Sequence, residues 1–335
     1  MATTDYGAIS QRTAAWAATE MLSHAEPVLV LSKFGQSKPL PKNKADTVKF
    51  RRPVPFPAVT TPLTEGVTPT ARQMSYEDVT VQIKQWGDVV EITDYVNDLA
   101  EDPVLSDASM LCGEQAAETI ELQTWGTLRA GTNVFYANGS SRTDVNSAIT
   151  LSKQRAITRS LKGNRAKKVT SMVSASPNYS TEPVDAAFIA FAHTDLEADI
   201  RDMTNFVPTE KYGSMKALPY EIGKVEDVRY ILSPMLTNWE DAGGDPTANG
   251  VVSTSGGSPG QADVYPVVYI GKEYYGLIPL KGKNAIKPSV LNPDTKTKDD
   301  PLGQRGYVGW KTYFVAKILN EGWGARLEVA ASNLE

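Results

Sequence analysis

The pattern of apolar and polar positions predicts one long amphipathic helix near the middle of the chain, over residues 102–132. Asp102 and Pro103 are typical of a helix start, because an aspartate caps the first turn and a proline loses no hydrogen bond there. Apolar side chains recur on one arc of the helical wheel, and three acidic side chains are predicted opposite them: Glu114, Glu118 and Glu121. Gly131 is typical of the residue that ends a helix. We expect this helix to serve as a backbone on which sheets pack.

Two stretches in which apolar and polar residues alternate predict a long two-stranded ribbon over residues 46–92. The first strand is Thr47–Arg52, and the second begins at Tyr76, with a bulge expected at Trp86–Gly87. Five prolines lie between the two strands and exclude a regular hydrogen-bonded ladder there. A two-stranded ribbon is marginal in water by itself, so we expect this one to rest on a partner surface.

Residues 1–45 have the pattern of an arm that cannot fold alone. Ser10 is placed to cap a helix over Gln11–Ala25, and Pro27 ends it. The following stretch, Lys33–Ala45, is basic, contains prolines and has little apolar surface to bury. Such a segment needs a surface to lie on, either its own domain or a neighbouring subunit.

From about residue 169 the pattern changes to strands interrupted by a short helix, which predicts a second domain. Residues 185–192 form a buried-strand pattern, and Thr194–Glu197 is a capping box that opens the helix. The stretch 236–263 is rich in glycine and serine, which predicts a mobile loop.

The C-terminal segment is predicted to form a β-hairpin. Gly309–Leu319 alternates apolar and polar residues, Asn320–Gly322 fits a short turn, and Trp323–Ala331 supplies the second strand. We expect this hairpin to pack on the central helix, so that the end of the chain joins its middle.

Composition and charge narrow the class of protein. A chain of 335 residues with 41% hydrophobic and 22% charged content is typical of a soluble globular protein with room for two cores. The net charge of −5 gives no strong general attraction to polyanions or membranes, and no apolar run approaches the length of a membrane span. The single cysteine, Cys112, excludes an internal disulfide and falls on the apolar arc of the central helix.

The residue types that usually carry catalysis or metal binding are scarce. With two histidines and one cysteine, a Cys/His zinc site cannot be assembled. His193 precedes Thr194 at the start of a predicted helix, and the sequence contains no nucleophile elbow and no phosphate-binding glycine motif. The sequence therefore predicts neither an enzyme nor a cofactor or metal site.

A run of basic residues extends from Lys153 to Lys168 across a predicted helix and the loop after it. Such a run is typical of a solvated helix face. The sharper alternative is contact with phosphate groups or with an acidic neighbouring subunit.

Several long phrases of the sequence resemble one known family. They include TDYGAISQRTAAWAATEMLSHAEPVLVLSKFGQSKPLPKNKA, VKFRRPVPFPAVTTPLTEGVTP, GDVVEITDYVNDLAEDPVL, CGEQAAETIE and VEDVRYILSP. In these phrases the chain resembles the major capsid proteins of tailed phages of the enquatro-like podophage (schitovirus) type and their prophage relatives. The resemblance implies an α+β protein with the HK97-like capsid fold, which has an N-terminal arm, an extended loop made of a β-hairpin, a peripheral domain with a long spine helix, and an axial domain.

Carried over to this sequence, the resemblance implies 1–45 as the arm, 46–92 as the extended loop, 93–168 with 304–335 as the peripheral domain, and 169–303 as the axial domain. The helix at 102–132 would be the spine. The implied function is mechanical: self-assembly as hexamers and pentamers into an icosahedral shell that encloses phage double-stranded DNA without sequence specificity.

The resemblance also implies a location and partners. We expect the protein in the virion capsid, assembled in the host bacterial cytoplasm and without a membrane partner. Because the chain starts directly at the arm, any scaffold is expected to be a separate protein, next to portal and cement or decoration proteins. We expect no covalent crosslink between subunits.

On this hypothesis the ribbon of one copy lies across the spine region of its neighbour. Three basic residues are the candidates on the ribbon: Lys49, Arg51 and Arg52. Three acidic residues are the candidates on the neighbour's helix: Glu114, Glu118 and Glu121. A single exposed ion pair contributes little, but many repeats in one shell can fix the register of the contact.

Two alternatives stay open. An encapsulin-type nanocompartment uses the same fold to enclose enzyme cargo, and the nucleic acid content of purified particles separates it from a virus shell. A monomeric β-rich protein that binds carbohydrate or peptide through the loop at 236–263 is the second alternative, and light scattering would then find a small, stable species.

Overall fold

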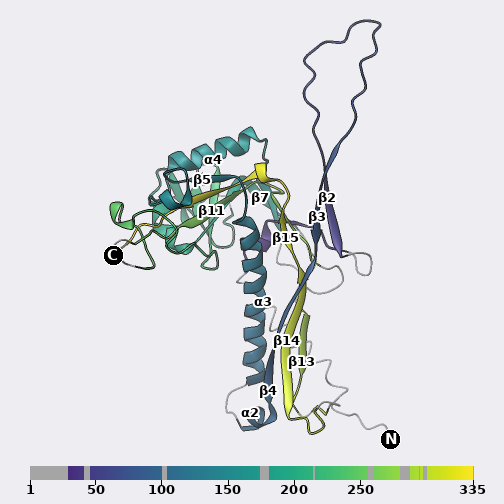
Figure 1. The fold of residues 1–335 in the computed structure, drawn as a ribbon, viewed down its shortest axis with the longest axis vertical. Helices are drawn as coiled ribbons and strands as arrows, with labels where there is room; N and C mark the ends of the chain where they lie inside the picture. Colours follow the sequence, from purple (N-terminus) through teal and green to yellow (C-terminus); the bar gives the residue numbers. More distant parts are fainter. Residues whose placement is uncertain are drawn as a thin grey trace.

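In the computed structural model the chain forms an elongated molecule with one long helix at its centre (Figure 1). The structure describes residues 29–40, 46–99, 104–173, 181–213, 216–255, 260–279, 287–293, 295–296 and 300–334. A narrow sheet runs along the helix, a larger body of strands and short helices lies at one end of it, and a two-stranded ribbon projects beside that body. The helix predicted at residues 11–25 lies outside the described residues.

The central helix, α3, spans Val104–Leu128, which confirms the predicted helix in type, although it ends before the predicted end at 132. The predicted start at Asp102 and Pro103 lies outside the described residues. Its 25 residues extend about 37 Å at roughly 1.5 Å per residue. Its buried apolar side chains are mostly small: Ala108, Cys112, Ala116, Ala117, Ile120, Trp125 and Leu128. Glu121, predicted on the polar arc, is buried too, so this part of the prediction is wrong. The reason is that α3 is covered on more than one side, because a turn of the N-terminal segment lies against it as well as the strands.

The narrow sheet along α3 has the order β13-β14-β4 and is antiparallel throughout. Its strands are β4 (Lys84–Thr93), β13 (Lys287–Leu291) and β14 (Arg305–Phe314). β4 pairs with β14 over its whole length without a register shift, so the predicted ribbon ends before β4 and the bulge at Trp86–Gly87 is wrong. Gly87 is needed for close approach instead, since a Cβ there would lie 2.6 Å from the carbonyl oxygen of Trp310.

The ribbon consists of β2 (Thr47–Pro53) and β3 (Tyr76–Gln82), which pair antiparallel as predicted. Residues 54–75, named here the distal loop, contain no strand, in agreement with the four prolines of this region. A small apolar core anchors the base of the ribbon: Leu40, Val48, Phe50, Val81 and Ile278. Figure 1 shows the ribbon and the distal loop projecting away from the rest of the molecule.

The larger body is built on an eight-stranded sheet with the order β5-β16-β11-β7-β10-β9-β8, in which β6 also pairs with β7. The strands are β5 (Val134–Tyr136), β6 (Val169–Val173), β7 (Thr181–Ala192), β8 (Phe206–Pro208), β9 (Glu221–Val225), β10 (Val228–Leu232), β11 (Tyr265–Ile270) and β16 (Gly324–Val329). Helix α4 (Leu151–Gly163) covers one face and shares a core with Phe188 and Tyr230. The other face contributes to the core that contains the end of α3, and the short helix α5 (Glu197–Arg201) follows β7.

A third, small sheet ties the N-terminal segment to the body. It contains β1 (Gln36–Ser37), β12 (Tyr275–Leu277) and β15 (Ala316–Ile318), in the order β1-β12-β15. The short turn η2 (Leu31–Lys33) precedes β1 and lies against α3. Residues 29–40 therefore lie on their own chain. A short helix, α2 (Asp94–Leu99), follows β4 on the way to α3.

The predicted C-terminal hairpin is wrong. β14 pairs with β13 and β4, whereas β16 pairs with β11 and β5 in the larger sheet. Every residue of β16 is buried, so this strand is covered by neighbours that a surface hairpin does not supply. As a result, β5 and β16, from the ranges expected to be peripheral (93–168 and 304–335), share a sheet with strands from the range expected to be axial (169–303).

Part of the glycine- and serine-rich stretch 236–263, predicted as a mobile loop, packs against the body. Val251 and Ala262 are buried with Ala330 in a small cluster of their own. Gly243 permits a close approach, because a Cβ there would lie 2.3 Å from the carbonyl oxygen of Val145. Gly243 thus serves packing at this point.

Candidate assembly surfaces

Two of the three basic residues predicted to contact a neighbour, Arg51 and Arg52, are already paired across the ribbon. Arg51 lies opposite Asp78, with its Nε 2.8 Å from Oδ1 and its Nη2 3.0 Å from Oδ2. Arg52 donates to Glu77, its own cross-strand partner. The hydrogen bond from Arg51 lowers the pKa of the Asp78 carboxyl. Both pairs are exposed, so they support the ribbon itself through cross-strand contacts.

Lys49 and two of the three predicted glutamates do lie at the surface. Lys49 is exposed on β2, opposite Thr80, and its backbone oxygen accepts a hydrogen bond of 2.8 Å from Lys38 Nζ. Glu114 and Glu118 are half-buried on α3. The structure does not bring the basic and acidic candidates together within one chain, since β2 pairs with β3 and α3 packs against β4, β14 and β15.

Glu121 is fully buried at the junction between α3 and the N-terminal segment. Its Oε1 accepts hydrogen bonds from the backbone N–H groups of Val30, at 3.2 Å, and Leu31, at 2.9 Å. Its Oε2 has no hydrogen-bond partner among the described residues. Burial raises the pKa of Glu121 to about 7, although the two N–H groups and Lys33 act in the opposite direction. Glu121 is therefore a contact within the chain and not part of an exposed acidic strip.

The sequence interpretation missed exposed apolar residues in two places. The distal loop and its flanks expose large side chains: Val54, Phe56, Val59, Leu63, Val67, Met74 and Tyr76. Strand β4 and the helices α2 and α3 expose a second set: Val89, Val90, Tyr95, Val96, Leu111 and Leu122. The signal for most of the first set was present, because the prolines at 55, 57, 62 and 69 disfavour a ladder that could cover the apolar side chains between them.

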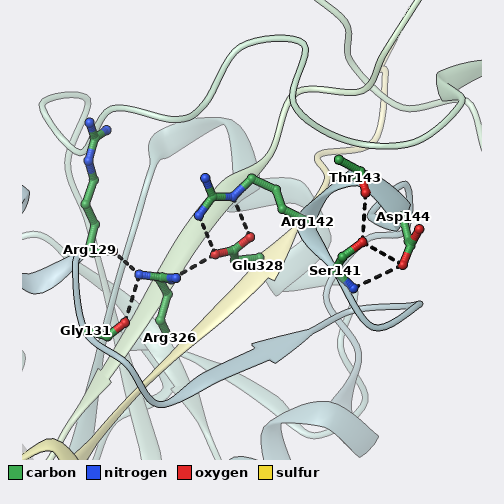
Figure 2. A network of polar contacts seen from close by, with 8 residues as sticks. All are labelled: Arg129, Gly131, Ser141, Arg142, Thr143, Asp144, Arg326 and Glu328. Atoms are coloured by element: carbon green, nitrogen blue, oxygen red, sulfur yellow. Dashed lines mark hydrogen bonds and ion pairs between the residues drawn. The ribbon is translucent and has the colours of Figure 1, made fainter.

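A network of arginines around a buried glutamate joins the end of α3 to the larger sheet (Figure 2). Glu328 on β16 accepts two hydrogen bonds from Arg142, of 2.8 and 2.9 Å, and Arg326 Nε lies 2.9 Å from its Oε1. Arg326 also donates to the carbonyl oxygens of Arg129 and Gly131, which follow α3. These contacts fix the direction of the helix relative to the sheet.

The described residues hold no group of three or more metal-ligating side chains. Cys112 is buried on α3, where burial raises the pKa of its thiol and so disfavours the reactive thiolate. His193 Nδ1 accepts the N–H of Asp195 at 3.2 Å, so this side chain caps the turn at Thr194–Leu196. In the part of the chain that is described, no helix is long and apolar enough to cross a membrane.

The fold is shared with phage capsids. The capsid of Ralstonia phage GP4 has a TM-score of 0.63 at 11% identity, over 91% of each chain. The holo-SrpI encapsulin complex from Synechococcus elongatus PCC 7942 has a TM-score of 0.51 at 11% identity, over 90% of this chain and 87% of that one. These similarities confirm the predicted α+β HK97-like capsid fold.

Sequence comparison gives the family. The major capsid protein of Pseudomonas phage KPP21 is 24% identical over 210 residues, which cover 58% of this chain and 52% of that protein. The match therefore spans about half the length of that relative. A profile of the phage capsid protein family matches residues 76–325. This range is most of the chain, which therefore belongs to the phage capsid protein family: it is a structural protein of the virion capsid and not an enzyme.

Proposed function

We propose that copies of this chain assemble, as hexamers and pentamers, into a closed icosahedral shell around phage double-stranded DNA. The observation that carries the proposal is the distal loop, which leaves the body and carries exposed apolar side chains (Figure 1). Exposed apolar patches on a soluble protein mark contact surfaces. A lattice of copies supplies each projecting ribbon with a neighbour to lie on.

The proposed receiving surface is the exposed apolar set on β4, α2 and α3 of the neighbouring copy. The lengths fit, because the roughly 11 residues in each arm of the distal loop reach about 36 Å at roughly 3.3 Å per residue. That reach matches the length of α3, about 37 Å. Among the charged candidates, Lys49 on the ribbon and Glu114 and Glu118 on the neighbour's helix stay proposed contacts at the rim of this interface.

The test removes apolar surface from the distal loop. Val59 is 72% exposed and Leu63 is 76% exposed. The matched control is the pair Leu302 and Leu334, which have the same exposed fractions, 72% and 76%. We expect Val59→Ser with Leu63→Ser to lower the yield of shells in a sucrose gradient several-fold, while Leu302→Ser with Leu334→Ser leaves it unchanged. Equal yields from both double variants, checked for folding by circular dichroism, would contradict the proposal.

We also propose a division into arm (1–45), extended loop (46–82), a peripheral unit of α2, α3 and the narrow sheet, and an axial unit of the larger sheet with α4. It follows the sheets, whereas the sequence boundaries at 93–168, 169–303 and 304–335 cross the larger one. A density map of the shell tests it. The larger sheet is expected near the centre of each hexamer and pentamer, and the narrow sheet near its rim.

We propose further that the shell belongs to a tailed phage of the enquatro-like podophage type and assembles in the bacterial cytoplasm. The support is the set of long phrases that resemble this type. A scaffold, a portal and cement proteins are the expected separate partners. Electron microscopy of the particles, which should show short tails, and mass spectrometry of their proteins test this finer assignment.

The similarity to the encapsulin complex keeps a second candidate function in view. An encapsulin-type compartment would enclose protein cargo, so purified particles would contain a second protein and little nucleic acid. We expect nuclease-resistant double-stranded DNA in the mature particles instead. The third candidate, a monomeric β-rich binding protein, predicts a single small species by light scattering at concentrations where we expect assemblies.

A further inference from the structure

Helix α4 is held firmly on the larger sheet, so the direction of its outer face is fixed. Ile157 and Leu161 are fully buried in the core below it. Gln154 is buried as well, donates to the carbonyl oxygen of Val225 at 2.8 Å and accepts from the hydroxyl of Tyr230 at 2.8 Å. Thr158 is buried too, so the side of α4 that carries Arg155, Arg159 and Lys162 is the exposed one.

The solvent side of α4 and the loop after it carry a dense set of cations: Lys153, Arg155, Arg159, Lys162, Arg165, Lys167 and Lys168. We call this set the α4 basic face. On the helix, Arg155, Arg159 and Lys162 follow one another at spacings of four and three residues, which places them in one stripe. The whole chain has a net charge of −5, so this excess of positive charge is local.

Two carboxylates at the turn between β9 and β10 pair with part of the α4 basic face. Glu226 pairs with Arg155, and Asp227 lies 2.6 Å from Lys162 Nζ and 3.0 Å from Lys168 Nζ. The other four cations, which have no side-chain hydrogen bond or ion pair among the described residues, are Lys153, Arg159, Arg165 and Lys167. The face therefore carries more positive charge than its own chain compensates.

The α4 basic face lacks the apolar centre of a protein–protein contact. Between residues 123 and 219 the described part of the chain exposes no large apolar side chain. Protein interfaces have an apolar core from which lysine is depleted. A duplex backbone requires the opposite: several exposed cations and no apolar patch, since phosphate contacts give affinity without reading sequence.

We propose that the α4 basic face binds the phosphate backbone of the enclosed double-stranded DNA without sequence specificity. This inference rests on the proposed function and adds the surface that faces the DNA. The contact is electrostatic, so each phosphate neutralised adds roughly 0.9 to the slope of log K against log salt concentration.

The test uses the full chain and a mixed-sequence double-stranded DNA fragment, with binding measured by fluorescence anisotropy across a series of NaCl concentrations. The variant is Lys153→Gln, Arg159→Gln and Lys167→Gln, which leaves the pairs with Glu226 and Asp227 intact. The control removes three exposed lysines elsewhere, as Lys84→Gln, Lys211→Gln and Lys317→Gln. We expect the α4 variant to lower the salt slope by about 2 to 3, and the control to lower it by much less. An unchanged slope in the α4 variant, or an equal loss in both, would overturn the inference.

Shell formation by electron microscopy separates this inference from the proposed function. We expect the α4 variant to form shells in normal yield. If the unaltered chain forms no shells, the proposed function fails whatever the DNA binding. If shells form and the α4 variant has the same salt slope of DNA binding as the control, the proposed function stands and only the assignment of the α4 basic face to DNA is overturned. If the α4 variant folds but cannot form shells, the face is a contact between copies, and the inference is overturned.

Discussion

Two buried glutamates near the same end of α3 hold two different junctions, and they are surrounded in different ways. Glu328, at the junction with the larger sheet, is contacted by the guanidinium groups of Arg142 and Arg326. Glu121, at the junction with the N-terminal segment, is contacted by two backbone N–H groups, and its second oxygen has no partner among the described residues. One junction therefore depends on opposite charges, and the other depends on hydrogen bonds to one carboxyl.

The difference matters for how each junction responds to conditions. Burial disfavours a charged carboxylate unless positive groups compensate it. Glu121 receives only N–H groups and the more distant Lys33, and its pKa is raised to about 7. The junction between α3 and residues 29–40, which belong to the proposed arm, is thus sensitive to pH near neutrality.

The largest effect is expected from Glu328→Gln. Removing one partner of a buried ion pair leaves the other charges uncompensated, and such changes destabilise by about 3–5 kcal/mol. Urea unfolding of the unassembled protein measures the loss. Glu77→Gln is the control, because its pair with Arg52 is exposed and its removal should hardly change the unfolding midpoint. Similar midpoints for the two variants would show that the Glu328 network is not a stabilising joint.

The next effect is the pH dependence that Glu121 creates. Its folded pKa, about 7, lies above the ordinary value of 4.5. Folding therefore favours the protonated form: the stabilisation is complete below about pH 4.5 and is lost as the pH rises to about 7. The rise of the Glu121 pKa from 4.5 to about 7 corresponds to about 3 kcal/mol of unfolding free energy, at 1.36 kcal/mol per pKa unit. Glu121→Gln, which stays neutral, should remove this part of the pH dependence of unfolding.

Glu118→Gln is the matched control for Glu121, because it changes a half-buried glutamate on the same helix. We expect the Glu118 variant to keep the pH dependence of the unaltered chain. Hydrogen exchange of the Val30 and Leu31 amides reports the same junction locally, and protection should fall between pH 5 and 8 only where Glu121 is present. Identical profiles for all three proteins would contradict the raised pKa.

A smaller effect is expected from Tyr275→Phe. The hydroxyl of the buried Tyr275 donates a hydrogen bond to the carbonyl oxygen of Leu31. The N–H of the same residue donates to Glu121. Removal of the hydroxyl leaves a buried carbonyl without that partner, which costs about 1–2 kcal/mol. Tyr274→Phe is the control, since the adjacent tyrosine is buried but donates no hydrogen bond among the described residues. Equal exchange protection of residues 29–40 in both variants would remove Tyr275 from the junction.

The sequence predicted the parts of the fold that depend on local patterns. The period of the apolar residues indicated α3, and alternation with prolines indicated the ribbon and its loop without a ladder. The helical wheel failed at Glu121, because it assumes one buried face whereas α3 is covered by strands and by the turn at Leu31. No periodicity within α3 contains that information, since the covering turn lies about 90 residues away.

Pairing between distant strands was the second failure. The short turn at Asn320–Gly322 favoured a hairpin, yet β16 pairs with β11 and β5, and its charged residues Arg326 and Glu328 pair with each other in a buried strand. For the charged site candidates, a signal was available: the register of the ribbon places Arg51 opposite Asp78 and Arg52 opposite Glu77. The apolar residues of the distal loop were then the better candidates for a contact surface.

The smallest effect is expected at the exposed pair of Arg51 and Asp78, which is surrounded by water, whereas the two buried glutamates are surrounded by protein. Arg51→Glu would place two acidic side chains opposite each other at Asp78, and we expect a modest loss of shell yield by sedimentation, because the ribbon frays. The swap Arg51→Glu with Asp78→Arg restores the cross-strand pair with its direction reversed. If Arg51 acts within its own ribbon, the swap recovers the yield of the unaltered chain. A swap variant that assembles as poorly as Arg51→Glu alone would show that Arg51 acts on an acidic group of the neighbouring copy, as the sequence hypothesis expected.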